Sequence, residues 1–579
     1  MKKFLIGLAT GIVLCGLIVV ILAFSLVRLG SRPPSVSEGS TLVLKLQGDV
    51  PERAPTEVPI PFLESQSPLT VADVWLTLRK AAADPRIRAV LFEPENLNIG
   101  WARMQELHAE LLQFRKSGKP LVAFLRTPGT REYYLATAAD KIYMMPEDML
   151  DLKGLRIEAM YFKGTLDKLG VEADVVHAGK YKDYGDMFTM SSMTPETREV
   201  LNDVLDQFYG DLSSTIADAR HKTPDQIRAI IDRGPFNGTQ AVTEGLVDVT
   251  GFQDAVAGDL QKRLNQSELT KLALRTYVKT PAPAGVEGHA RIALVVGEGE
   301  ITRGDDNQGW GGDEMGITSG GFSKLLRQVA DDSSIRGAII RVNSPGGDSV
   351  ASDDILHAAQ ELSHKKPVVI SMGDLAASGG YFISMTGDPI VAYPNTLTGS
   401  IGVVFMKPNL HGMWDKIGVH MDVLQRGQFA GLYSTYTPPT PAEQDKLRAQ
   451  VDDFYHTFLT RVATGRRKPF EAIEPLAQGR VWLGAQAKGN GLVDEIGGLD
   501  RAVELVKQKA KIGAGEKITL VAYPPRRSIF DRLMNREDES PAINGAIRTK
   551  LRAIFGDLPI DALTRGGFLK VMPYSITVH

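Results

Sequence analysis

Residues 336–347 read Arg-Gly-Ala-Ile-Ile-Arg-Val-Asn-Ser-Pro-Gly-Gly, an apolar run that ends in a turn sequence. The apolar part predicts a buried strand over 337–342, and Pro-Gly favours a turn directly after it. An amphipathic helix is expected at 351–362 and a further apolar strand at 368–372. Strands that alternate with helices at this spacing predict an α/β fold with largely parallel strand pairing.

The chain also repeats itself at a nearly constant shift. The matching segments are Arg-Ala-Val-Leu-Phe at 88–92 with Arg-Gly-Ala-Ile-Ile at 336–340, Asp-Lys-Leu-Gly-Val at 167–171 with Asp-Lys-Ile-Gly-Val at 415–419, and Gly-Leu-Val-Asp at 245–248 with the same residues at 491–494. Chance matches would not keep one offset over so long a stretch, so most of the chain is a tandem duplication. Thr440-Pro-Ala-Glu443 is a capping box that opens a long helix, and Thr194-Pro195 opens its counterpart in the first half.

These features divide the chain into six segments. We predict a transmembrane anchor at 1–28, a linker at 29–40, a first repeat at 41–278, a linker at 279–289, a second repeat at 290–512 and a C-terminal tail at 513–579. The tail has no counterpart in the first half. Its residues 543–555 alternate apolar and basic side chains, which is typical of a packed terminal helix or of a helix on a membrane surface.

The anchor prediction comes from residues 4–27, which carry no charge for 24 residues. About 20 apolar residues suffice to cross a bilayer as a helix. Lys2 and Lys3 precede the stretch, which favours a cytoplasmic amino terminus with the rest of the chain on the other side. A cleaved signal peptide is the alternative, but the apolar run is longer than usual and no small-x-small site follows it.

Composition excludes several classes of protein. Of 579 residues, 43% are hydrophobic and 23% charged, as in an ordinary globular protein. The net charge of −3 offers no general attraction for nucleic acid. The single cysteine, Cys15, can form neither an internal disulfide, a zinc cluster nor a CxxC redox pair. We also expect no metal and no cofactor.

Candidate catalytic residues emerge from the way the two repeats differ. The second repeat contains Asn-Ser-Pro-Gly346-Gly347 and Ala-Ala-Ser378-Gly379-Gly380, whereas the first has neither glycine pair. A serine that opens a helix beside free backbone N–H groups is a candidate nucleophile, and those N–H groups are candidate oxyanion donors. The simpler interpretations are a turn and an N-cap serine.

Lysine shows the opposite pattern. Lys180 and Lys182 lie in the first repeat, and Ala430 stands opposite Lys182 in the second. This complementary loss predicts one composite site where the halves meet. The simpler interpretation is that Lys180 and Lys182 are two solvated lysines on a loop. A lysine can act as a general base if burial lowers its pKa from about 10.4 to about 7–8. Ser378 would then attack a carbonyl carbon and form an acyl-enzyme.

At these residues the chain resembles the signal peptide peptidase A family of bacteria, also called protease IV, in its long duplicated form. The resemblance rests on Gly-Asp-Leu-Ala-Ala-Ser378-Gly-Gly-Tyr, Arg-Val-Asn-Ser-Pro-Gly-Gly347 and Thr-Gly-Ser400-Ile-Gly-Val, and it covers about residues 40–510. It implies a ClpP/crotonase-like spiral of ββα units in each repeat. It also implies a Ser/Lys dyad shared between the halves.

By this resemblance Ser378 is the nucleophile and Lys182, rather than Lys180, is the base. The oxyanion donors would be the N–H groups of Gly347 and Gly379, and Ser400 would position the lysine amine. Two aspartates, Asp183 and Asp348, depart from the family pattern. Because an acid near Lys182 would favour its charged form, we expect both aspartates to face solvent.

The implied function is a membrane-anchored serine endopeptidase that degrades cleaved signal peptides and other hydrophobic peptides. The resemblance also implies a homotetramer in the bacterial inner membrane with periplasmic catalytic domains. Two alternatives remain: a catalytically inactive peptide-binding scaffold on the same fold, and an acyl-CoA enzyme, since related folds host both. Retention of the dyad and the glycine turns disfavours the scaffold, and an anchor that exports the domain disfavours CoA chemistry.

Overall fold

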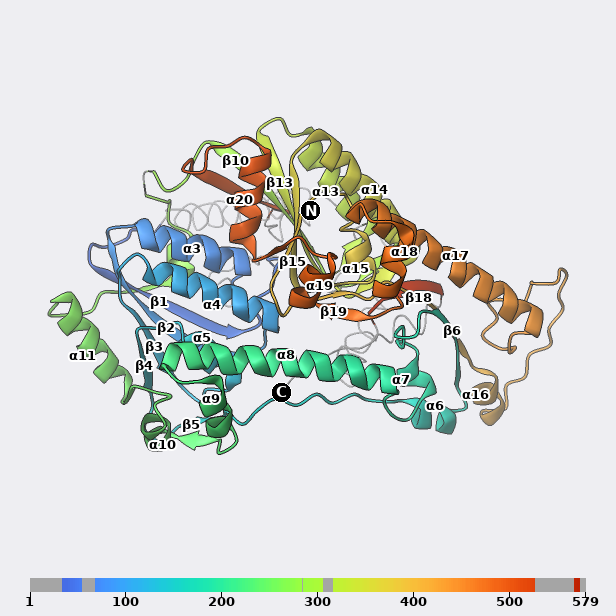
Figure 1. Ribbon diagram of the computed structural model, residues 1–579, viewed down its shortest axis with the longest axis horizontal. Helices are drawn as coiled ribbons and strands as arrows, with labels where there is room; N and C mark the ends of the chain where they lie inside the picture. Colours follow the sequence, from blue (N-terminus) through green and yellow to red (C-terminus); the bar gives the residue numbers. More distant parts are fainter. Residues whose placement is uncertain (1–33, 55–67, 284, 306–315, 526–566, 573–579) are drawn as a thin grey trace, which may run out of the picture.

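The computed structural model describes residues 34–54, 68–283, 285–305, 316–525 and 567–572 (Figure 1). None of the helices within these ranges is long and apolar enough to span a bilayer. The apolar stretch at 4–27 and the segment at 543–555 lie outside the described residues.

The first half is built on a parallel sheet of six strands in the order β8-β4-β3-β2-β1-β9. Its strands are β1 (Ser40–Gly48), β2 (Ile87–Leu97), β3 (Leu121–Leu125), β4 (Lys141–Met144), β8 (Val249–Thr250) and β9 (Lys271–Ala273). Its helices are α3 (Val71–Ala83), α4 (Trp101–Arg115), α5 (Thr130–Ala136), α6 (Lys163–Leu169), α7 (Asp186–Thr189), α8 (Pro195–Arg220), α9 (Pro224–Ile231), α10 (Gly238–Thr243), α11 (Gln253–Leu264) and α12 (Leu274–Val278). A short ladder joins β5 (Met149–Leu150) to β7 (Phe236–Asn237).

The second half repeats this sheet. Strands β10 (Ala290–Glu298), β13 (Ile335–Ser344), β15 (Val368–Ala377), β16 (Ile390–Ala392), β20 (Glu495–Ile496) and β21 (Ile518–Tyr523) pair in parallel in the same order as their counterparts. β17 (Leu397–Gly399) and β19 (Val481–Leu483) extend the sheet beyond β15. The helices are α13 (Ser319–Asp331), α14 (Ser349–Lys365), α15 (Gly379–Phe382), α16 (His411–Lys416), α17 (Pro441–Arg466), α18 (Phe470–Ile473), the 3-10 turn η1 (Glu474–Leu476), α19 (Gly484–Asn490) and α20 (Leu499–Lys509).

Equivalent side chains confirm the duplication. The hydroxyl of Tyr133 donates to the carbonyl of Leu246 at 2.7 Å, and that of Tyr381 donates to the carbonyl of Leu492 at 2.8 Å. The long helices α8 and α17 are both 26 residues and both begin with proline. At α17 the capping box of Thr440 is complete, because its hydroxyl accepts from the backbone N–H of Glu443 and the Glu443 carboxylate accepts from the Thr440 N–H.

A third sheet joins the two halves. Its order is β12 (Ile317–Thr318), β11 (Ile301–Thr302), β14 (Gly346–Asp348), β22 (Gly567–Val571), β18 (Val403–Asn409) and β6 (Glu172–Ala178). β6 comes from the first half and runs antiparallel to β18 over seven residue pairs. β22 comes from the C-terminal tail and lies antiparallel between β14 and β18. Figure 1 shows β6, β18 and α17 together at one end of the molecule.

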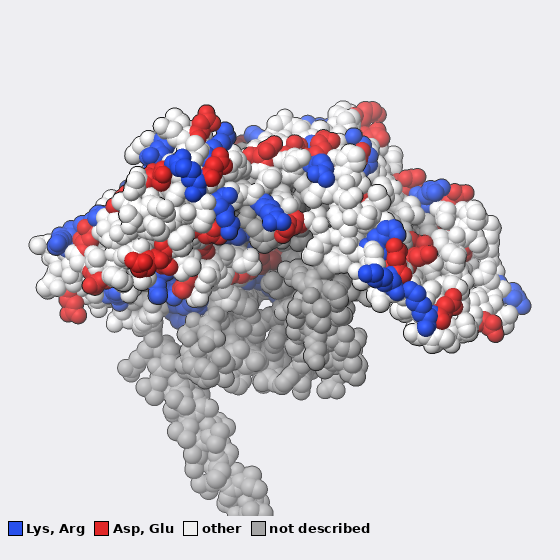
Figure 2. Space-filling view, turned by 90° about the horizontal axis from the view of Figure 1, so that it is seen from below, with Lys and Arg blue, Asp and Glu red and all other residues white. Residues whose placement is uncertain are grey.

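The halves also share their largest apolar core. One buried cluster runs from Trp101 and Phe208 in the first half to Ile292 and Val506 in the second. Arg341 of β13, which is 1% exposed, crosses this boundary and bonds Glu52 and Glu106 of the first half at 2.6 and 2.5 Å. The two halves therefore form a single packed body. Figure 2 shows positive and negative side chains interspersed over the face that it displays.

Candidate active site

Ser378 lies at a strained corner between β15 and α15. Its backbone has φ 54° and ψ −113°, a conformation that non-glycine residues rarely adopt. The N–H of Ser378 donates to the carbonyl of Gly399 at 2.8 Å, and its carbonyl accepts from Phe382. These backbone bonds hold the hydroxyl at the carboxyl end of β15. The strain indicates that the position of this side chain is set by surrounding structure.

Lys182 reaches Ser378 from the first half. It follows β6, whose pairing with β18 carries this part of the first half onto the second. Its Nζ lies 2.8 Å from the Ser378 Oγ, 3.0 Å from the Ser400 Oγ and 3.0 Å from the Ser400 carbonyl oxygen. The structure thus brings together three of the five residues singled out from the sequence. Lys180, by contrast, is exposed and lies against the ring of Tyr181.

Glycines make room for the lysine. A Cβ on Gly479 would lie 2.5–2.7 Å from the N, Cβ and Cα atoms of Lys182, and one on Gly402 would lie 3.0 Å from its Cδ. Gly479 also has φ +76°, which favours glycine. These two glycines contribute to the site by allowing close approach. The sequence comparison missed them, because their role depends on contacts between distant segments.

The lysine environment favours a neutral amine. Lys182 is fully buried, and burial lowers its pKa well below the ordinary value; the charge on Lys570 acts in the same direction, and Asp183 opposes both. A neutral amine has two N–H donors and one lone pair. The donors match the two Ser400 oxygens, and the lone pair matches the Ser378 O–H. All three contacts are therefore satisfied when Lys182 is poised to accept the serine proton.

Asp183 is not where we predicted it. It is 6% exposed rather than facing solvent, and one carboxylate oxygen accepts a hydrogen bond from the Thr197 hydroxyl at the start of α8. The turn that buries Lys182 also carries its neighbour inward, against α8. Burial raises the pKa of Asp183 to about 7, so its neutral form is accessible near neutrality. A neutral Asp183 does not oppose the lowered pKa of Lys182.

Asp348 is half-buried instead of freely solvated. It caps α14 by accepting from the N–H groups of Val350 and Ala351 at 2.9 Å, and it pairs with Arg303 at 2.8 Å. These partners occupy its carboxylate. The expectation of a solvent-facing side chain is therefore only partly met.

The glycine turns lie against one another beside Ser378. Gly346 and Gly347 have φ of +103° and +153°, and a Cβ on Gly347 would meet the backbone of Ile301 at 2.0 Å. A Cβ on Gly379 would lie 3.1 Å from the Gly347 nitrogen. Only glycine lets these segments approach so closely. The backbone nitrogens of Gly347 and Gly379 thus flank one small volume, as two donors to a single oxyanion must.

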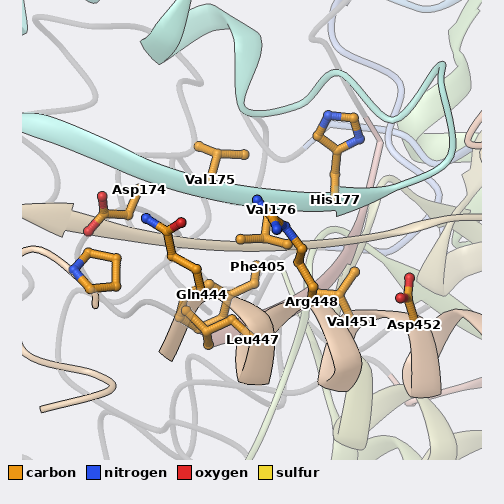
Figure 3. Close-up of a pocket in the computed structure, with 11 residues that line it drawn as sticks. Asp174, Val175, Val176, His177, Phe405, Gln444, Leu447, Arg448, Val451 and Asp452 are labelled. Carbon is orange, nitrogen blue, oxygen red and sulfur yellow. The ribbon is translucent and has the colours of Figure 1, made fainter. Parts of the chain in front are cut away.

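A groove opens farther along the same sheet (Figure 3). It has a volume of about 440 Å³ and lies between β6 and α17. Val176, Phe405 and Leu447 contribute apolar surface, whereas His177 and Arg448 are polar. The Phe568 ring of β22 packs at a tilt against that of Phe405, 5.1 Å between centroids, within the apolar cluster beneath this groove.

No group of metal-ligating side chains is found in the part of the chain that the structure describes. A buried serine beside a buried lysine whose pKa is lowered, with paired backbone donors, is the arrangement of a serine hydrolase that uses lysine as its base.

The two halves each match peptidase family S49, at residues 113–267 and 360–513. These two copies, together with relatives that match most of the chain, identify it as a serine peptidase. The chain belongs to peptidase family S49, in its long duplicated form. The structure confirms a duplicated α/β fold. The ClpP/crotonase-like spiral implied by the resemblance stays a prediction.

Three curated relatives cover most of the chain. The chloroplastic serine protease SPPA of Arabidopsis thaliana is 33% identical over 508 residues, which are 86% of this chain and 73% of that protein. Protease 4 of Salmonella typhi is 31% identical over 524 residues, 86% of this chain and 80% of its own. Protease 4 of Haemophilus influenzae is 32% identical over 471 residues, 76% and 73% respectively.

Proposed function

We propose that this serine peptidase uses Ser378 as nucleophile and Lys182 as general base, and that it degrades hydrophobic peptides, among them cleaved signal peptides. The observation that carries the proposal is the 2.8 Å contact between Lys182 Nζ and Ser378 Oγ, made between the two halves in a fully buried site. Ser400 positions the amine through its hydroxyl and its carbonyl oxygen.

The proposed reaction proceeds in two stages. Lys182 takes the hydroxyl proton while the Ser378 Oγ bonds to the peptide carbonyl carbon, and the N–H groups of Gly347 and Gly379 hold the resulting oxyanion. Lys182 then gives the proton to the departing amine, leaving an acyl-enzyme. A water molecule, deprotonated by Lys182, attacks the acyl carbon; the bond to the Ser378 Oγ breaks, Lys182 returns the proton to that oxygen, and the second product leaves.

The peptidase function is better supported than either alternative. An inactive scaffold would have no need of a buried lysine whose contacts match the neutral form. Family S49 membership likewise argues against an acyl-CoA enzyme. Cleavage of signal peptides is proposed from the resemblance, and the apolar side chains of Val176, Phe405 and Leu447 in the groove between β6 and α17 support hydrophobic substrates.

The proposal includes a membrane anchor and a homo-oligomer, a homotetramer by the resemblance. The uncharged residues 4–27 would hold the chain in the bacterial inner membrane, with the catalytic halves in the periplasm. Exposed apolar side chains on the arm between α16 and α17 support self-association: Ile417 is 63% exposed, Val423 54% and Leu424 95%. Such a patch is typical of an interface between proteins.

The decisive test is hydrolysis of a synthetic signal peptide and of fluorogenic apolar peptides by the full-length chain in detergent. Ser378→Ala and Lys182→Ala should each lower kcat by about 10³-fold or more while leaving the fold intact. Lys180→Ala is the matched control and should retain activity, because its amine is exposed. Loss of activity in Lys180→Ala with retention in Lys182→Ala would overturn the assignment of the base.

A further inference from the structure

The turn that joins η1 to β19 brackets the proposed base. The carbonyl of Gln478 accepts from the N–H of Tyr181, the residue before Lys182, at 2.8 Å. The carbonyl of Arg480 accepts from the N–H of Ser400 at 2.7 Å. Ser400 in turn contacts the Lys182 amine through both of its oxygens. One short turn of the second half therefore contacts the lysine segment at its backbone and also holds the partner of its amine.

The Arg480 side chain ties this turn to the first half. Its guanidinium pairs with Glu199 at 2.5 Å and with Asp203 at 2.6 Å, both on α8. The same group lies over two rings, 5.0 Å from the centroid of Tyr181 and 4.7 Å from that of Trp482. Only 14% of the Arg480 side chain is exposed. A planar guanidinium can meet two carboxylates and two ring faces at once, which the compact ammonium group of a lysine cannot.

The start of α8 also anchors both neighbours of Lys182. The Tyr181 hydroxyl donates to Glu199 at 3.2 Å, and Asp183 accepts from a threonine in the first turn of the helix. Arg480 joins the second half to the same end of α8. Loss of this tie would leave the lysine segment and the first half able to shift against the half that carries the serine.

The first repeat has a different residue at the equivalent turn. Gly479 is followed by Arg480, whereas Gly234 in the first half is followed by Pro235. Both turns lead into a short strand, β19 in the second half and β7 in the first. Of the two turns, the one with arginine is therefore the one that receives the lysine.

Arg480 acts on Lys182 through position rather than through charge. Burial has the largest effect on the pKa of Lys182, and the charged groups that act on it most are Asp183 and Lys570. Arg480 is not among them. A displaced lysine segment would admit water to the amine and weaken the burial that lowers its pKa.

We propose that Arg480 is a positioning residue for the general base: by fastening the turn between η1 and β19 to α8, it keeps the Lys182 amine in line with the Ser378 hydroxyl. The proposal deepens the proposed peptidase function and rests on it. It adds to the site a side chain that contacts no reacting atom.

Steady-state kinetics of the full-length chain in detergent, with a fluorogenic apolar peptide and over a range of pH, test the proposal. Arg480→Met should lower kcat about 10- to 100-fold and change KM by less than about twofold. It should also move the acid limb of kcat/KM to higher pH by about one unit, because the amine becomes easier to protonate. Arg480→Lys should lie between parent and Arg480→Met. A parental kcat and acid limb in Arg480→Met would overturn the proposal.

The acids on α8 separate position from charge. The double variant Glu199→Gln, Asp203→Asn removes the partners of Arg480. Loss of two negative charges would by itself lower the pKa of Lys182 and move the acid limb to lower pH, whereas loss of position moves it to higher pH. We expect a shift to higher pH, as in Arg480→Met, and little further loss of kcat when Arg480→Met is added. Opposite shifts in the two variants would refute positioning.

Arg220→Met is the matched control for a general loss of stability. The Arg220 guanidinium pairs with Asp248 at 2.7 Å, donates to the Gly245 carbonyl at 2.7 Å and is also 14% exposed, but it lies at the other end of α8. This variant should lower the melting temperature and leave the acid limb in place. An equal shift of the limb in Arg220→Met would show that destabilisation alone moves it, and would overturn the proposal.

A fluorophosphonate probe distinguishes failure of the positioning role from failure of the proposed function, because it reacts with an activated serine without needing a peptide. Slower labelling of Arg480→Met than of the parent would support the role. Labelling of the parent but not of Ser378→Ala, with equal rates in the parent and Arg480→Met, would refute the positioning role alone. A folded parent that is neither labelled nor active would refute the peptidase mechanism and, with it, the positioning role.

Discussion

At the scale of single residues, the environment of Lys182 depends on its sequence neighbour. Asp183 lies buried under α8, with one oxygen bonded by Thr197 and the other, Oδ1, without a hydrogen-bond partner among the described residues. A carboxylate there is costly, and burial raises its pKa from 3.8 to about 7. Ionised Asp183 in turn raises the pKa of Lys182. Ionisation of Asp183 near pH 7 therefore changes how readily Lys182 is protonated.

Asp183→Asn should stabilise the protein, and more so at pH 8 than at pH 4. The folded state binds the Asp183 proton more tightly than the unfolded state, so stability falls as pH rises from about 4 to about 7. The full difference is on the order of 4 kcal/mol, and asparagine removes it while still accepting from Thr197. Thermal unfolding at the two pH values measures the gain.

The same variant should shift the pH profile of peptide hydrolysis. Without the carboxylate, the pKa of Lys182 falls further, so the acid limb of kcat/KM moves to lower pH. An unchanged limb, or a shift to higher pH, would show that Asp183 does not act on the lysine.

Gly479 offers a way to displace the base without altering either member of the dyad. Gly479→Ala places a methyl group 2.5 Å from the backbone nitrogen of Lys182 and strains a positive φ. A shift of about 1 Å in a catalytic group can cost about 100-fold in rate, so we expect kcat to fall by about that factor. Gly489→Ala is the control, because nothing lies within 4 Å of its Cβ. Full activity in Gly479→Ala would contradict the close packing of the lysine.

At the scale of elements, β22 fills the space between β14 and β18 in the third sheet. Because β22 lies between β14 and β18, a substrate strand can pair with the glycine turn only after β22 leaves. The serine, the lysine and Ser400 are all fully buried with β22 in place. If a peptide pairs with β14 in the same place it has to displace β22, and we expect this displacement to raise the apparent KM.

Met572→Pro should weaken this competition. Proline removes the N–H that donates to the Pro345 carbonyl, a bond worth about 0.5–1.5 kcal/mol. We expect KM for a fluorogenic apolar peptide to fall about 2- to 10-fold with kcat unchanged. Steady-state kinetics of the full-length protein measures both constants. A KM that rises or stays constant would show that β22 does not limit peptide access.

At the scale of the whole molecule, a buried ion cluster fastens the halves together. Arg341 bonds Glu52, Glu106 and Ser371, and all of these groups are buried. Because Lys182 and Ser378 come from different halves, any loosening of this junction separates the dyad. Integrity of the site is thus a property of the complete duplicated body.

Arg341→Met should destabilise the protein by about 3–5 kcal/mol, because it leaves two buried carboxylates without a counter-charge. The midpoint of urea-induced loss of activity measures the effect. Adding Glu52→Gln and Glu106→Gln should recover much of the loss, since neutral amides need no counter-charge. Failure of the triple variant to improve on the single one would show that packing, rather than charge, accounts for the destabilisation.

The sequence predicted the parts of this structure that depend on local pattern or on internal repetition. The strand at 337–342, the helix at 351–362 and the capping box at Thr440 all lie where their patterns indicate. The comparison of repeats led to Ser378 and to a loop with two lysines, and the family resemblance selected Lys182. Each of these inferences compared short stretches of sequence, either with the other repeat or with the motifs of the family.

The remaining features depend on contacts between distant segments. Asp183 is buried because its turn packs on α8. The spacing of residues in the sequence does not show whether a loop side chain is buried or exposed. Gly479 matters only because Lys182, far away in sequence, crosses it. β22 itself has no counterpart among the described strands of the first half, so the internal repeat could not place it. β21, from the same segment, extends the second sheet as β9 extends the first.

The division of the dyad between halves also has a consequence for the timing of synthesis. Lys182 precedes Ser378 by 196 residues, which a ribosome adding 5–20 residues per second covers in about 10 to 40 s. Throughout that interval the nascent chain carries a base without a nucleophile. Under the proposed mechanism, the chain becomes a peptidase only once its second half has been made and has docked on the first.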